Sequence, residues 1–225
     1  MNFQRVRVLL LPIFGLLSIF AKAADTAASG TNTDVSPDVV AKVGAVWNFE
    51  LQGDRISEMK WARELTAGPG PDWVISWAKG VVFRLSSQGK PIEMAFTSID
   101  GKEVDLRALK GHVVLVDFWA TWCAPCTEEL PGLEATYSRL HSKGLEVVGI
   151  SWDNDIGKLA RFATEKKIPW PQYCDGQKPG KWGLAFGIGG VPYTILVDKA
   201  GNVRFFGASV DHSKLEERLS LLLAE

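Results

Sequence analysis

A Cys-x-x-Cys motif shortly after an apolar run is the feature that most restricts how this chain can fold. The run Val113–Val116 is too short for a helix and predicts a central strand buried on both faces, as in a parallel sheet. Cys123-Ala124-Pro125-Cys126 follows, and residues 127–130 have the character of a helix opening. We therefore expect both cysteines at the point where a strand end turns into a helix N-terminus.

That position favours redox chemistry of the cysteine pair. Unpaired N–H groups and the helix dipole stabilise a thiolate at a helix N-terminus. The spacing lets both sulfurs meet over the first turn, so a disulfide can open and close with little backbone movement. Cys123 lies nearer the strand end and is expected to be the more exposed sulfur and the nucleophile, whereas Cys126 should resolve the mixed disulfide.

A Cys-x-x-Cys pair can have two other roles, zinc binding and a purely structural disulfide. Zinc sites use the same spacing, but zinc needs four ligands, and Cys174 and the three histidines are not at a paired-ligand spacing. A purely structural disulfide across so few residues closes too small a loop to add much stability. We therefore expect a dithiol redox site with neither a metal nor another cofactor.

Residues 117–126, DFWATWCAPC, resemble the active-site segment of the thioredoxin superfamily. The longer run through Pro131, with the upstream pattern DGKEVDLRALKG, is similar to the extracytoplasmic thiol–disulfide oxidoreductases of the TlpA/ResA type in the redoxin branch. A second match is Gly189-Gly190-Val191-Pro192-Tyr193. The resemblance covers roughly residues 93–223 and implies a thioredoxin-like α/β sandwich, a central mixed sheet flanked by helices.

The resemblance also implies roles for two carboxylates. Asp117 matches the buried acid of thioredoxin, a proton acceptor on the central strand. Glu129 matches a glutamate that tunes the cysteine pKa values in the TlpA/ResA group. The alternatives are a hydrogen-bonded strand-end aspartate for Asp117 and a solvated helix residue for Glu129.

By the same resemblance, the substrate-binding surface lies around a cis-proline. Pro192 would lie against the disulfide and turn the Val191 backbone outward to pair with an extended peptide. Tyr193 departs from the small hydroxyl residue that is common after this proline. Trp122 is expected on the contact surface, whereas Trp119 is expected in the core.

The chain begins with a segment typical of export. Arg5 and Arg7 precede the apolar run 8–20, and Ala21-Lys22-Ala23 has small residues where a signal peptidase reads them. The apolar run is shorter than the roughly 20 residues needed to span a bilayer. Residues 1–23 are thus predicted to be a cleavable signal peptide, which leaves a periplasmic or otherwise extracytoplasmic protein with no stable membrane span.

Residues 24–91 precede the part that resembles the family. Residues 24–35 are predicted to form a disordered spacer, and residues 36–91 a mostly helical extension. Its helices are expected from Pro37, with Ser36 as cap; over about 54–66, with Ile56, Met59, Ala62 and Leu65 on one face; and over 72–86. Four tryptophans are expected to pack these helices on one another or on the main domain, or else to bind substrate: Trp47, Trp61, Trp73 and Trp77.

Residues 92–225 are predicted to form the thioredoxin-like domain. Asp100-Gly101 predicts a hairpin between two short extended segments, and residues 170–173 are expected to be irregular. A final helix is expected after a cap at Asp211 or Ser213. The other expected elements are a short turn over 106–109, strands over 145–151, 193–197 and 203–207, and helices over 124–141, 156–167 and 179–186.

We interpret the chain as an exported thiol–disulfide oxidoreductase that acts as a reductase. Its partners are expected to be disulfide-bonded or dithiol proteins, with a membrane thiol as the electron donor. A formal net charge of −1 and no basic block argue against nucleic acid. A thiol peroxidase is one alternative, although Thr121 precedes Cys123 by two residues and not by the three that peroxidases need. A non-enzymatic binding module, such as a copper chaperone, is the other. Cys174 is expected to be a partly buried, unreactive thiol.

Overall fold

A computed structural model describes residues 35–176, 180–208 and 212–225 of the 225-residue chain. The predicted signal peptide, nearly all of the predicted spacer and the candidate cap Asp211 lie outside these ranges. Of the helices within the ranges, none is both long enough and apolar enough to cross a membrane.

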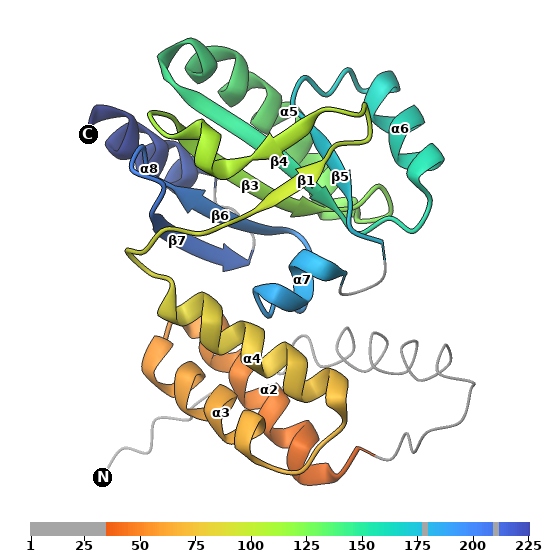
Figure 1. Cartoon of the computed structure of the whole chain (residues 1–225), viewed down its shortest axis with the longest axis vertical. Helices are drawn as coiled ribbons and strands as arrows, with labels where there is room; N and C mark the ends of the chain where they lie inside the picture. Colours follow the sequence, from red (N-terminus) through yellow and green to blue (C-terminus); the bar gives the residue numbers. More distant parts are fainter. Residues whose placement is uncertain (1–34, 177–179, 209–211) are drawn as a thin grey trace, which may run out of the picture.

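A five-stranded mixed sheet forms the centre of the main domain (Figure 1). Its middle strand β3 (Val113–Trp119) pairs in parallel with β4 (Leu145–Ser151) and antiparallel with β6 (Tyr193–Val197). At the edges, β5 (Gln172–Cys174) runs parallel to β4, and β7 (Val203–Ala208) runs antiparallel to β6. The fold is thus the predicted thioredoxin-like arrangement, with β3 at its middle.

The apolar sequence of β3 follows from cover on both faces of the strand. Successive side chains of a strand point to opposite faces. On one face Leu115 and Asp117 share a cavity with residues of α5 (Ala124–Leu140) and α8 (His212–Ala224). On the other face Phe118 packs edge-on against Phe186. β3 is therefore buried along most of its length, and Asp117 is the one polar residue on it.

Smaller elements complete the domain. The predicted hairpin is present: β1 (Ala95–Thr97) pairs antiparallel with β2 (Glu103–Asp105), and Gly101 in the turn has φ +82°. The remaining short segments are η1 (Leu106–Leu109), η2 (His141–Lys143), α6 (Ile156–Glu165) and α7 (Lys181–Ala185).

The expectation that residues 170–173 are irregular holds for residues 170 and 171 and is wrong for the other two, because β5 begins at Gln172. Three residues are too few to show a strand period, and Pro171 in front of them reads as a breaker. What makes the strand is pairing at the end of β4. Gln172 is buried there, and its side-chain oxygen accepts a hydrogen bond from Trp119 Nε1 at 2.9 Å, which satisfies this polar group in the interior.

The N-terminal extension forms the three predicted helices, α2 (Pro37–Gln52), α3 (Arg55–Ala67) and α4 (Asp72–Ser86). Ser36 and Asp54 cap the first two helices through side-chain oxygens that accept hydrogen bonds from backbone N–H groups. The helices share a small core of their own, made of Val39, Val43, Val46, Ala62, Leu65, Val74, Trp77, Ala78 and Val81. They lie together on one side of the main domain (Figure 1).

The prediction of which residues form the buried face of α3 is wrong in part. Ala62 and Leu65 are buried, but Ile56 is 85% exposed. The buried position one turn before Ala62 belongs instead to Glu58. A charged residue takes the core-facing position there because it has a buried partner on α4, which periodicity does not reveal.

The extension also covers the free edge of β7. The Gly89 backbone N–H donates to Val203 O (2.7 Å), and the side chains of Gln88 and Arg55 donate to Arg204 O (2.7 Å) and Phe206 O (2.8 Å). Carbonyls on an edge strand would otherwise be open to pairing with another chain. The extension and the sheet are therefore joined through backbone groups as well as through apolar contacts.

Candidate functional site

Cys123 and Cys126 are joined by a disulfide at the N-terminus of α5. Cys123 is the N-cap residue of this helix, and its sulfur accepts a hydrogen bond from the Cys126 backbone N–H at 3.3 Å. An N–H group at a helix N-terminus stabilises negative charge on that sulfur. Cys123 and Cys126 are 5% and 4% exposed, so the expected difference in exposure is slight in the disulfide form.

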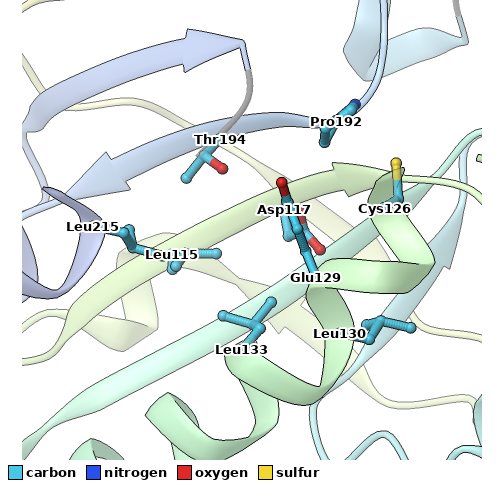
Figure 2. Close-up of a pocket in the computed structure, with 9 residues that line it drawn as sticks. All are labelled: Leu115, Asp117, Cys126, Glu129, Leu130, Leu133, Pro192, Thr194 and Leu215. Atoms are coloured by element: carbon cyan, nitrogen blue, oxygen red, sulfur yellow. The ribbon is translucent and has the colours of Figure 1, made fainter. Parts of the chain in front are cut away.

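A small cavity lies next to Cys126, between β3, β6, α5 and α8 (Figure 2). Its volume is about 20 Å³, which is enough for one water molecule. Polar groups enter it from Asp117, Glu129 and Thr194. The rest of its lining is Leu115, Cys126, Leu130, Leu133, Pro192 and Leu215. The cavity thus brings both predicted carboxylates next to Cys126.

Asp117 is partly buried on β3, and Glu129 reaches the same cavity from α5 (Figure 2). Burial, followed by the negative charge of Glu129, raises the pKa of Asp117 from 3.8 to about 7. A carboxyl group with this pKa exchanges protons at neutral pH. Geometry and pKa together suit Asp117 to take up a proton from a neighbouring thiol.

The Val191–Pro192 peptide bond is cis, as the resemblance implied. Pro192 lines the cavity together with Cys126 (Figure 2), and both Val191 and Pro192 are partly exposed. Both residues of the cis bond are therefore in part exposed to solvent beside the cavity.

The tryptophans near the motif divide as expected between surface and core. Trp122 is 45% exposed, whereas Trp119 is buried and bonded to Gln172. The intervening Thr121 binds Asp153 through its hydroxyl (2.6 Å) and its backbone N–H (2.9 Å), so it fixes the loop before the cysteines. The use of Trp122 as a contact surface stays a prediction.

Cys174, the cysteine outside the motif, is partly buried and unpaired. Its thiol donates to Asp153 O at 3.0 Å, and burial raises its pKa. A raised pKa keeps it in the unreactive thiol form. Among the described residues, no group of three or more His, Cys, Asp and Glu side chains is arranged to hold a metal ion.

Sequence reasoning missed a group of buried residues beside the cis-proline. Tyr193, the unusual residue after Pro192, is buried, and its hydroxyl donates to Glu50 Oε1 at 2.7 Å. The same hydroxyl accepts a hydrogen bond from Arg84 of α4 at 2.7 Å. Arg84 lies three residues after Val81 and so at a core-facing position of its helix. A charged residue at a core-facing helix position was the sequence signal that could have indicated a buried polar group here.

The family model that matches this chain is described as the AhpC/TSA family, and it covers residues 89–206. The match begins after α4, so it includes the disulfide and the cis-proline but not the helical extension.

Curated relatives carry names of thiol–disulfide enzymes. The thiol-disulfide oxidoreductase ResA of Bacillus thuringiensis (strain Al Hakam) is 33% identical over 107 residues, which are 48% of this chain and 61% of that protein. The thiol:disulfide interchange protein HelX of Rhodobacter capsulatus is 39% identical over 102 residues, or 45% of this chain and 53% of that protein. The chain thus spans less than two thirds of the length of these relatives.

Solved structures agree on the fold. A crystal structure described as a putative thiol:disulfide interchange protein DsbE from Chlorobium tepidum has a TM-score of 0.56 and 26% identity, and covers 61% of this chain and 97% of that one. A putative thioredoxin from Neisseria meningitidis gives the same TM-score at 23% identity, over 61% of this chain and 92% of that one.

Proposed function

Because the chain belongs to the AhpC/TSA family and is a redoxin of the TlpA/ResA type, we propose that it is a thiol–disulfide oxidoreductase that exchanges disulfides with partner proteins. The observation that carries the proposal is the disulfide of Cys123 and Cys126 at the N-terminus of α5, beside cis-Pro192. A disulfide across the first turn of a helix opens with little backbone movement, which suits it to exchange with thiols of a partner.

In the reductive direction, the Cys123 thiolate attacks one sulfur of the partner's disulfide. A mixed disulfide forms, and the partner's other sulfur leaves as a thiolate and takes up a proton. Cys126 then loses its proton and attacks Cys123 Sγ, so the Cys123–Cys126 disulfide forms and the second partner sulfur leaves as a thiol. Two electrons pass to the partner, and a dithiol donor at the membrane restores the reduced enzyme.

The second step needs a base, because the Cys126 thiol is buried and ionises reluctantly. Asp117 and Glu129 line the cavity that Cys126 also lines, and the pKa of Asp117 lies near 7. We assign Asp117 as the proton acceptor in this step. Burial above all keeps the pKa of Asp117 high enough for proton exchange at neutral pH, and the negative charge of Glu129 raises it further.

Partner proteins dock around the cis-proline. The Val191 backbone pairs with an extended stretch of the partner, and the exposed indole of Trp122 supplies apolar contact area beside the nucleophile. Export by residues 1–23 places this exchange in the periplasm or another extracytoplasmic compartment, where disulfides form and persist.

Two single-cysteine variants test the assignment with insulin as the protein disulfide. We expect Cys123→Ser to abolish insulin reduction, and Cys126→Ser to accumulate a mixed disulfide that a gel without reductant resolves and dithiothreitol releases. Cys174→Ser is the matched control and should keep wild-type activity, because this thiol is held away from the exchange by its bond to Asp153 O. Alkylation of Cys126 before Cys123 near neutral pH would show that the nucleophile is misassigned.

A further inference from the structure

A single buried guanidinium holds both ends of the loop that carries the cis-proline. Arg84 is 1% exposed on α4. Its Nε donates to Phe186 O at 2.9 Å, where the loop leaves α7. Its terminal nitrogen donates to the Tyr193 hydroxyl at 2.7 Å, where the loop enters β6. Arg84 thus spans residues 186–193, the segment that contains cis-Pro192.

Two carboxylates of the extension keep this guanidinium in place. Glu58 of α3 lies 2.9 Å from one terminal nitrogen of Arg84, and Glu50 of α2 lies 2.9 Å from the other. Glu50 also accepts the hydrogen bond of the Tyr193 hydroxyl. All three helices of the extension therefore contribute to one fixed arrangement. The Arg84 guanidinium holds its N–H donors in a planar fork, a geometry that a lysine side chain does not reproduce.

The extension also touches the middle of the loop. A Cβ on Gly189 would lie 2.1 Å from the Trp47 ring, and a Cβ on Gly190 would lie 3.2 Å from it, so this indole of α2 packs directly on the loop backbone. At Gly187 a Cβ would meet the Val81 backbone nitrogen at 2.1 Å. The segment before Val191 thus packs closely against α2 and α4.

We propose that Arg84 is a positioning residue for exchange with protein disulfides: from the helical extension it fixes the cis-proline loop on which a partner's backbone docks. The inference rests on the proposed function of the disulfide. It follows because a partner pairs with Val191 through backbone groups, whose position must be held closely for the sulfurs to align. A small disulfide uses no such pairing and needs only the cysteines.

The test compares a protein disulfide with a small one in the full-length chain. Arg84→Lys keeps the positive charge but not the fork, and Tyr193→Phe removes only the hydroxyl. We expect both variants to raise KM for insulin and to lower kcat/KM about tenfold, which is less than the roughly 100-fold loss that a misplacement of about 1 Å can cause. Reduction of a small aromatic disulfide, 4,4′-dithiodipyridine, should stay within about twofold of wild type, because its approach needs no backbone pairing.

Leu65→Ala is the matched control for loss of stability. Leu65 is buried in the core of the extension. Well below the unfolding temperature this variant should keep the wild-type KM for insulin. If Arg84→Lys does not fold, Tyr193→Phe decides the question, since it deletes a single polar group.

Three outcomes would overturn the role of Arg84. The first is an unchanged KM for insulin in Tyr193→Phe and, if it folds, in Arg84→Lys. The second is a parallel loss of reaction with insulin and with the small disulfide, and the third is an equal loss in Leu65→Ala. A wild-type protein that reduces neither disulfide would instead contradict the proposed function itself.

Discussion

Asp117 is the residue at which burial, proton exchange and stability meet. Its pKa is 3.8 in an ordinary setting and about 7 in the fold. The folded protein therefore keeps this proton to a higher pH than the unfolded chain does. The resulting stabilisation is fully present below pH 3.8 and is lost as the pH rises through about 7. The loss is roughly 4 kcal/mol, at about 1.4 kcal/mol for each pKa unit.

We expect Asp117→Asn to stabilise the disulfide form at pH 8 by up to about 4 kcal/mol and to change it little near pH 4, because the amide never carries the buried charge. Thermal unfolding at the two pH values measures this. The same variant should remove the ionisation near pH 7 from the pH–rate profile of mixed-disulfide resolution, because an amide accepts no proton from Cys126.

Glu129→Gln distinguishes the role of Glu129 from that of Asp117. It removes the charge that helps to raise the pKa of Asp117, so the ionisation should move to lower pH and remain visible. Wild-type pH–rate profiles in both Asp117→Asn and Glu129→Gln would show that neither carboxylate takes part in proton exchange.

At the scale of elements, close approach between α4 and α7 fixes the extension on the domain. A Cβ on Gly80 would lie 2.0 Å from Leu184 O and 2.4 Å from the Gly187 nitrogen, and both are backbone atoms that cannot rotate away. Glycine here gives up helix propensity so that two backbones can touch. Gly44 of α2 makes no such contact, because nothing lies within 4 Å of an added Cβ.

The same substitution should therefore have opposite effects at these two glycines. We expect Gly80→Ala to destabilise the protein by about 1–3 kcal/mol through overpacking, although alanine is the better helix former. Gly44→Ala should stabilise it by up to about 1 kcal/mol. Urea denaturation of both variants measures the difference. Equal effects would mean that α4 and α7 do not meet as closely as described.

The elements also show what a sequence alone predicts. β3, β4, the hairpin and the three helices of the extension follow from periodicity, caps and turn residues, which act within a few neighbouring positions. β5 does not, because its pairing with β4 creates it. Ion pairs between distant residues are likewise not predicted from local sequence patterns. Glu58 and Arg84 each stand on an apolar helix face, and only their pairing explains why a charged residue is buried there. The cis bond at Pro192 was reached by resemblance alone.

For the whole molecule, the helical extension and the sheet form one structural unit. The extension covers the edge of β7, encloses Tyr193 and packs Trp47 on the cis-proline loop. The sequence predicted the helices, with packing of their tryptophans on the main domain as one alternative, which Trp47 follows. It did not predict the buried polar contacts, because these join residues more than 100 positions apart, such as Arg84 and Tyr193. We therefore infer that the two parts unfold together.

Arg84→Met tests this coupling, since it removes the buried cation between Glu50 and Glu58 and leaves Glu58 with the more exposed Arg55 at 3.4 Å. Removing one partner of a buried ion pair commonly costs about 3–5 kcal/mol. Because α2, α3 and the sheet all depend on this group, we expect the loss to appear in the unfolding of the whole chain. Urea denaturation followed by far-UV circular dichroism and by tryptophan fluorescence should give one coincident transition in wild type, at a lower midpoint in Arg84→Met.

Arg139→Met is the matched control, because Arg139 and its partner Glu216 are about half exposed on the surface of the domain. Removing such a pair usually costs less than about 1 kcal/mol. The contrast between the two Arg→Met changes therefore measures burial and not charge. A wild-type protein whose two probes give separate midpoints would show that the extension unfolds on its own. In that case the buried charges would stabilise the helices without coupling them to the sheet that carries Cys123 and Cys126.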